Sequence, residues 1–169
     1  MESSYLAACC CFTLLCLMTA WSSKTLSSGP SAAEAHQDGA PLAACNTMMP
    51  LHGGTTEQSP ETSPYFLEVY DRHNSHPVTE YRPGDRRPIK VALGGSEAYR
   101  GYLLGARSLL DSQRRVGAFL EPLPQGAQFL ACEPTNPNAT VTHVCQRPKL
   151  SSSFWWRPPS SNVGPISFL

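Results

Sequence analysis

The chain from about residue 65 onward alternates short apolar runs with clusters of turn-forming residues. Residues 65–70 alternate with a period of two, which is typical of a half-buried β-strand. Residues 89–93 repeat this pattern before the pair Gly94-Gly95, where we expect the strand to end. No stretch sustains the periodicity of an amphipathic helix, so the pattern predicts an antiparallel sandwich or barrel. Further strands are predicted at 99–106, 116–120, 127–132, 139–144, 153–156 and 165–169.

The first twenty residues have a different character. Residues 6–20 are almost entirely apolar, which matches a signal-peptide core and falls short of the ~20 residues that span a bilayer. Ala20 and Ser22 are small residues suited to cleavage. We therefore expect residues 1–22 to form a secretory signal peptide, although an N-terminus without Lys or Arg leaves an uncleaved anchor or a buried helix as the alternative.

The remaining chain predicts one domain behind a flexible leader. Residues 23–38 are rich in small and polar residues without apolar periodicity, so we expect them to be flexible. The rest, residues 39–169, has the length of one ordinary domain. Nothing after Ala20 approaches a membrane span, so we expect the chain as given to be released without a transmembrane anchor.

Charge and motifs exclude several functions. Thirteen Lys and Arg balance thirteen Asp and Glu, so no chain-wide field favours nucleic acid as a partner. G-x-S-x-G and H-E-x-x-H are both missing, and His73 and His76 have no Cys or carboxylate at ligand spacing. The sequence therefore predicts no enzyme, no cofactor and no metal site.

Residues 99–107 read Y-R-G-Y-L-L-G-A-R, with Cys45 before them and Cys132 after them. Together with other motifs in the same order, this segment resembles the reeler domain found at the N-terminus of reelin, whose corresponding segment is F-x-G-F-L-L-Q-A-R. The resemblance implies an immunoglobulin-like β-sandwich over residues 39–169, of a kind found in secreted and cell-surface proteins, including insect defence proteins and ferric-chelate reductase. It also implies that His52 and His143 belong to the family pattern, and we expect them to bond the main chain. The other matching residues are Gly39-Ala40-Pro41, Cys45, Met49-Pro50, His52-Gly53, Gln58-Ser59, Pro64-Tyr65, Tyr81-Arg82-Pro83-Gly84, Gly117-Ala118-Phe119, Cys132, Thr142-His143, Lys149, Phe154 and Trp156.

The last strand departs from the family pattern. The family continues through W-x-A-P into V-x-F-x-A-T, whereas this sequence has residues 156–159 as WRPP and stops at Leu169. We therefore expect a last strand that is cut short, with an open sheet edge that favours association. The chain is then an isoform or fragment, or it tolerates the open edge.

Three cysteines follow the predicted signal peptide. The resemblance pairs Cys45 with Cys132, a bond that suits a secreted domain. Cys145 is then left over, to pair with another chain, to replace Cys45 as the partner of Cys132, or to stay buried. The sequon Asn138-Ala139-Thr140 predicts N-glycosylation at Asn138.

Two surface features are candidates for binding. Arg82, Arg86, Arg87 and Lys90 could gather at one edge, with Arg107, Arg114 and Arg115 in neighbouring turns, and would suit a sulfated or anionic glycan. The alternative is a solvated edge that discourages strand pairing. Trp155 would point outward if Phe154 and Trp156 point inward.

The sequence thus predicts a secreted, non-enzymatic recognition or adhesion module, with innate defence as the family analogy. The alternative is an extracellular regulatory or structural domain of a longer membrane protein, such as a ferric-chelate-reductase-like parent, at the cell surface. The expected partner is an unidentified extracellular protein or glycan, and a disulfide-linked or edge-paired dimer is a further expectation.

Overall fold

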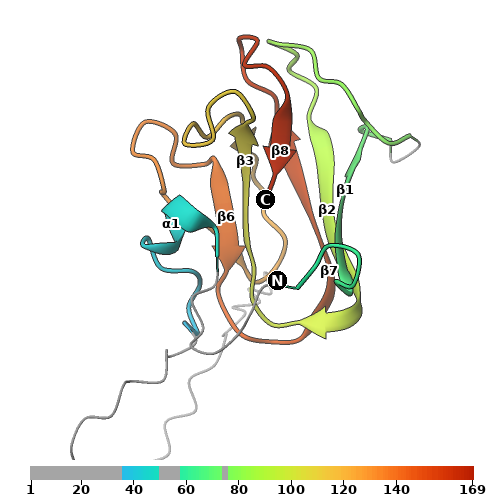
Figure 1. The fold of residues 1–169 in the computed structure, drawn as a ribbon, viewed down its shortest axis with the longest axis vertical. Helices are drawn as coiled ribbons and strands as arrows, with labels where there is room; N and C mark the ends of the chain where they lie inside the picture. Colours follow the sequence, from blue (N-terminus) through green and yellow to red (C-terminus); the bar gives the residue numbers. More distant parts are fainter. Residues whose placement is uncertain (1–35, 50–57, 74–75) are drawn as a thin grey trace, which may run out of the picture. The chain divides into compact units, whose positions relative to one another are not determined.

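The computed structural model describes residues 36–49, 58–73 and 76–169, and two antiparallel sheets make up its fold. One sheet has the order β1-β2-β7-β4 and the other β5-β6-β3-β8 (Figure 1). The predicted antiparallel sandwich is confirmed. The strands are β1 (Tyr65–Tyr70), β2 (Ile89–Tyr99), β3 (Leu103–Ser108), β4 (Ala118–Phe119), β5 (Ala127–Phe129), β6 (Thr140–His143), β7 (Lys149–Arg157) and β8 (Ile166–Phe168).

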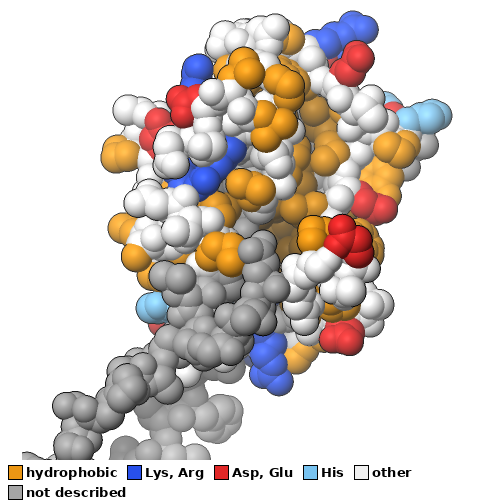
Figure 2. All heavy atoms as spheres, in the orientation of Figure 1, with side chains coloured by type: hydrophobic (Ala, Val, Ile, Leu, Met, Phe, Trp, Pro, Cys, Tyr) orange, Lys and Arg blue, Asp and Glu red, His pale blue; other side chains and the backbone are white. Residues whose placement is uncertain are grey.

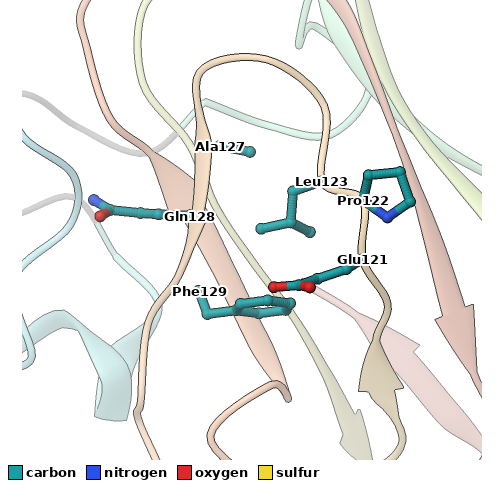
Figure 3. A pocket seen from close by; sticks show the side chains of 6 residues that line it. All are labelled: Glu121, Pro122, Leu123, Ala127, Gln128 and Phe129. Carbon is teal, nitrogen blue, oxygen red and sulfur yellow. The ribbon is translucent and has the colours of Figure 1, made fainter. Parts of the chain in front are cut away.

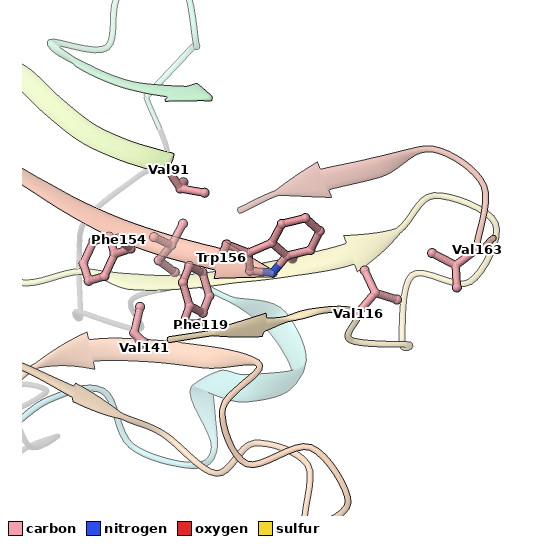
Figure 4. Close-up of a cluster of buried hydrophobic side chains, with 9 residues drawn as sticks. Val91, Val116, Phe119, Val141, Phe154, Trp156 and Val163 are labelled. Atoms are coloured by element: carbon pink, nitrogen blue, oxygen red, sulfur yellow. The ribbon is translucent and has the colours of Figure 1, made fainter. Parts of the chain in front are cut away.

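The core lies between the two sheets and is centred on β7. Phe154 and Trp156 alternate on its inner face and are each 1% exposed. Trp155 lies on the other face and is half-buried. The Trp156 ring meets the Phe168 ring of β8 edge-on at 5.0 Å, which joins the two sheets. Figure 4 shows this cluster, which consists of Val91, Leu104, Ala106, Val116, Phe119, Val141, Phe154, Trp156 and Val163.

β2 is longer than the sequence predicted. It does not end at Gly94-Gly95 but continues to Tyr99, with a register shift between Gly94 and Tyr99. The two glycines pair with Phe66 and Tyr65 of β1. A Cβ at Gly94 would lie 2.6 Å from Cζ of Phe66, so the glycines admit aromatic rings from the neighbouring strand instead of forming a turn.

The sequence did not predict the single turn of helix α1 (Ala44–Thr47). It contains Cys45, which forms a disulfide with Cys132 across a Cα–Cα distance of 5.5 Å. Met48 ends the helix in the left-handed conformation, and its N–H donates to the Ala44 carbonyl at 2.8 Å. The disulfide thus ties the segment before β1 to the segment after β5.

β1 and β8 are edge strands of the two sheets. β8 has only three residues and pairs with β3, and Leu169 and Gly105 exchange two main-chain hydrogen bonds of 3.0 Å just beyond it. β1 does not show the expected alternation of buried and exposed positions, since residues 65–68 are all exposed. Its apolar side chains are uncovered because the strand borders an opening between the sheets.

Candidate functional site

A cavity of about 1100 Å³ opens between β1 and β2 of one sheet and β3 and β8 of the other. Its mouth lies on the side where the sheets end in their edge strands β1 and β8. On the opposite side the sandwich is closed, because the N–H of Phe119 in β4 donates to the Asn138 carbonyl, two residues before β6, at 2.8 Å. Figure 2 shows hydrophobic side chains gathered along the furrow between the two sheets.

The lining is mostly apolar and comes from five strands, the helix and the segments beside them. Leu93 on β2 and Leu104 on β3 form the inner wall, and Leu104 is almost completely buried. The helical segment adds small and flexible side chains, including Met48 and Met49. The remaining apolar lining residues are Ala40, Pro41, Ala43, Ala44, Pro60, Tyr65, Phe66, Leu67, Gly101, Tyr102, Leu103, Phe168 and Leu169.

His143 marks the polar part of the cavity. Its Nδ1 accepts from the Tyr102 N–H at 3.2 Å, and its Nε2 lies 3.3 Å from the His36 carbonyl, to which it donates in that tautomer. Gly101 is required beside it, because a Cβ there would lie 2.7 Å from Cε1 of the His143 ring. Both ring nitrogens are engaged by main chain, as the sequence analysis expected of this histidine.

The cavity favours uncharged ligand groups. None of the described lining residues is Asp, Glu, Lys or Arg. Burial raises the pKa of the Tyr102 phenol, with smaller contributions from Tyr99 and Cys145, so this side chain also stays neutral. A charge placed inside would lose its hydration without gaining a partner of opposite charge from these residues.

A second hollow lies between the segment after β4 and strand β5. It has a volume of about 640 Å³ and is lined by Glu121, Pro122, Leu123, Ala127, Gln128 and Phe129 (Figure 3). Leu123, Ala127 and Phe129 pack against the core. Among the described lining residues, the exposed Glu121 carries the only charged side chain. The hollow is smaller than the cavity between the sheets and is lined by only six residues, so it is the weaker candidate for a binding site.

The predicted basic edge is only partly formed. Arg82, Arg86 and Arg87 are exposed in the turn before β2, while Lys90 is half-buried within it. The Arg87 guanidinium pairs with Asp85 at 2.8 Å and, through this hydrogen bond, lowers the pKa of that carboxyl. Part of the positive charge of the edge is therefore already neutralised.

Arg107 and Arg115 do not extend this edge, which corrects the expectation that they lie in neighbouring turns. Arg107 is a buried residue of β3, and its Nη2 donates to the Cys45 carbonyl at 2.7 Å and the Asn46 carbonyl at 2.9 Å. Arg115 donates to the same Cys45 carbonyl. Burial, and then the charge of Arg107, lowers the pKa of Arg115. These two side chains hold α1 in place.

The other residues singled out from the sequence are dispersed. Cys145 lies half-buried between β6 and β7, outside the disulfide, and its carbonyl accepts from Lys149 Nζ at 3.0 Å. Asn138 is exposed, and so are His73 and His76. His52 lies outside the described residues.

The described residues contain neither a metal-binding cluster nor a membrane-spanning helix. Over 36–49, 58–73 and 76–169, no three His, Cys, Asp or Glu side chains are grouped to hold a metal ion. In the same part of the chain, no helix is long and apolar enough to cross a membrane.

Sequence reasoning missed the cavity. Its one signal was the run of three consecutive apolar residues, Tyr65-Phe66-Leu67, at the start of β1. A half-buried strand covers apolar side chains on one face only, so three in succession indicate either a strand buried on both faces or an uncovered edge. The structure has the second arrangement.

Two antiparallel sheets, tied to a leading segment by a disulfide and open between their edge strands, define a disulfide-bonded β-sandwich domain. The chain belongs to the reeler domain family, whose profile matches residues 43–169. Among solved structures, the human F-spondin reeler domain superposes with a TM-score of 0.50 at 20% identity, over 63% of this chain and 71% of that one.

Curated relatives cover most of the chain. The Drosophila melanogaster "Defense protein l(2)34Fc" is 30% identical over 139 residues, which cover 80% of this chain and 76% of that protein. A Bombyx mori protein named for an inferred defence role is 32% identical over 140 residues, or 80% of this chain and 74% of its own. A Drosophila melanogaster protein named for inferred homology to a ferric-chelate reductase is 25% identical over 143 residues, which are 82% of this chain but 21% of that protein.

Proposed function

We propose that this protein is an extracellular recognition protein of a defence response, and that it acts by binding a ligand in the cavity between its sheets. The observation that carries the proposal is the cavity itself, about 1100 Å³ in volume, with mostly apolar walls and no Asp, Glu, Lys or Arg side chain among its described lining residues. Pockets that bind small molecules have this character, with mostly apolar walls and a few placed polar groups.

The chemistry of the lining supports binding without turnover. General acid–base catalysis needs a group that can exchange a proton with the ligand. His143 has both ring nitrogens engaged by main chain, and Tyr102 has a raised pKa. Burial of apolar ligand surface would supply the affinity, at roughly 25 cal/mol per Å².

The biological setting rests on relatives and on the disulfide. Relatives at 30% and 32% identity, over four fifths of this chain, are named for defence. The Cys45–Cys132 bond is typical of proteins that fold in an oxidising compartment. Both agree with the signal peptide predicted for residues 1–22.

Titration with Nile red, an uncharged dye that brightens in apolar surroundings, tests the proposed site. We expect saturable binding to the intact protein. Leu67→Asp places a charge on the cavity wall at a position that is 37% exposed, and should weaken binding at least tenfold. Leu150→Asp is the matched control, because Leu150 is 62% exposed and lies outside the cavity. Equal binding by both variants, or no binding by the unmodified protein, would contradict the proposal.

A second candidate is an extracellular domain of a longer membrane protein. The reductase-homologue relative favours it, because the match occupies only 21% of that protein. Cell-surface biotinylation followed by detection with an antibody against this domain would then reveal a larger membrane-bound species. Detection of only the short form, in the medium, would favour the first candidate.

A further inference from the structure

We infer that the ligand of this cavity is an amphiphile with one unbranched acyl chain. The chain enters between β1 and β8, and the head group stays outside. This inference rests on the proposed function of the cavity as a binding site. The inference concerns the class of ligand, which the proposed function leaves open. Three features of the cavity support the inference: the shape of the mouth, the positions of polar and apolar side chains on the walls, and the side chains at the helical end.

The mouth is a slit. Its two sides are the edge strands β1 and β8, which are extended segments of chain, and residues 65–67 of β1 and Phe168 of β8 line the cavity from the two sheets. Figure 2 shows this furrow with hydrophobic side chains along it. A slit between strand edges admits a narrow unbranched chain, or a flat dye that enters edge-on, whereas a branched or non-planar group would have to part the sheets.

The walls carry polar side chains at the rim, and the buried polar side chain that lines the cavity, His143, already has both ring nitrogens engaged by main chain. At the rim, His36, Gln58 and Ser63 offer polar groups, and His36 and Gln58 are exposed. Further in, Leu93, Leu104 and Phe168 are apolar and buried or half-buried. A charged head group inside would be desolvated without a counter-charge among the described residues, so the chain enters and the head group stays in water.

The helical end of the cavity suits chains of varying length. Met48 and Met49 contribute unbranched thioether side chains, which fill irregular space and adapt to different occupants. The two small residues Ala43 and Ala44 leave room beside them. This end can therefore close around a chain terminus without requiring one fixed length.

The test is displacement of Nile red by two homologous series, alkanoic acids and alkyltrimethylammonium ions with 8 to 16 carbons, each used below its micelle concentration. Affinity should rise about fourfold per methylene, which corresponds to ~0.8 kcal/mol each, and then level off when the cavity is full. The two series should agree within about threefold at each length, because a head group left in water contributes little.

A shortened cavity sharpens the test. Leu93→Trp fills the inner wall and should move the plateau to shorter chains, and Leu103→Trp serves if the first variant does not fold. Leu150→Trp, on β7 and outside the cavity, should leave the plateau unchanged. Plateau positions are read from the same displacement titrations.

The outcomes separate the inference from the proposed function. If Nile red binds in a Leu67-dependent way but affinity does not depend on chain length, the acyl-chain inference is wrong and the cavity remains a binding site. Strong preference for one head-group charge also overturns the inference. If neither dye nor amphiphile binds, both fail. A stoichiometry of one ligand per two protein molecules, together with a doubled mass in solution, would show that the cavity is an interface between copies. That result would also overturn the acyl-chain inference.

Discussion

Arg107 places a charge in the interior, and its hydrogen bonds explain why the fold tolerates it. It donates to the carbonyls of Cys45 and Asn46 from a position that is 8% exposed. Hydrogen bonds to charged groups contribute about 1.5–3 kcal/mol each to stability. Arg107→Met keeps much of the apolar stem but removes the donors, so we expect the free energy of unfolding to fall by about 2–3 kcal/mol in urea titrations.

Arg114→Met is the control for this prediction. Arg114 is exposed, and its main-chain N–H and carbonyl form hydrogen bonds with Asp111 and Ser108 that the substitution leaves in place. Its substitution should change the unfolding free energy by no more than about 0.5 kcal/mol. Equal losses from both variants would show that the Arg107 hydrogen bonds contribute nothing beyond a surface charge.

Position 117 requires glycine for two reasons that can be tested separately, a left-handed backbone and a lack of space for a Cβ atom. It has a φ of 65°, and a Cβ there would lie 2.2 Å from Cζ2 of Trp156, the largest fully buried side chain. Gly126 has a similar φ of 81° but has space, with Lys149 Cε at 3.9 Å. We expect Gly126→Ala to cost about 1–2 kcal/mol from backbone strain, and Gly117→Ala to cost roughly 3 kcal/mol or more.

Thermal unfolding, with Trp fluorescence as the signal, measures both glycine variants. Gly117→Ala should also change the fluorescence of the folded state, because the indole of Trp156 must move. Similar melting temperatures for the two variants would mean that Trp156 relaxes at little cost and that the position requires only the left-handed backbone.

At the scale of elements, the sequence predicted where strands occur better than where they end. The sequence pattern located β1 at its observed bounds, although the burial of its residues does not alternate. It misplaced the end of β2, because Gly94 and Gly95 accommodate rings from β1 and do not form a turn. It also missed α1, because four residues are too few to show helical periodicity and a disulfide holds them.

The functional elements were harder to predict for a related reason. The cavity depends on which strands become sheet edges and how far the sheets part there, and both are tertiary properties. The burial of Arg107 depends on α1 packing beside β3. Both features arise from contacts between segments distant in sequence, which a local pattern does not encode.

The disulfide should account for much of the stability of the element it holds. Cys45 and Cys132 are 87 residues apart, and closing a loop of that length lowers the entropy of the unfolded chain by an amount worth about 4–5 kcal/mol. We therefore expect the double variant Cys45→Ala, Cys132→Ala to lose stability on that scale in denaturant unfolding. An unchanged melting temperature after reduction of the native protein would contradict this assignment.

At the scale of the whole molecule, the sandwich is asymmetric in how it closes. One side is sealed by β4 against the segment before β6, with Phe119 in the core. The other side leaves β1 and β8 as edges with apolar side chains exposed, including Phe66 at 50%. Such an edge favours association, so the expected edge-paired dimer and the acyl-chain ligand compete for the same side of the molecule. A ligand that covers this side should therefore also reduce self-association.

The sequon at Asn138 concerns both glycosylation in the secretory pathway and the stability of the folded domain. Asn138 is exposed, so an attached glycan fits the folded domain. Thr140 is completely buried in β6, and its Oγ1 has no hydrogen-bond partner among the described residues. An unsatisfied buried hydroxyl costs about 1–3 kcal/mol, so stability alone would favour valine here. If Asn138 is glycosylated before the domain folds, as the sequon predicts, the need for Ser or Thr at the third position of the sequon accounts for the hydroxyl.

Two variants that both lack the sequon separate these effects. For protein expressed through the secretory pathway, intact mass before and after deglycosylation should show a glycan on the unmodified chain and none on Asn138→Gln or Thr140→Val. The unfolding free energy of Thr140→Val should exceed that of Asn138→Gln by about 1 kcal/mol, since only the former removes the buried hydroxyl. Because neither variant carries a glycan, the difference excludes the effect of glycosylation, and the Asn138→Gln change contributes little to it because Asn138 is exposed. If Thr140→Val is the less stable of the two variants, the hydroxyl contributes to the stability of the fold. If the chain without substitutions carries no glycan, glycosylation does not account for the hydroxyl.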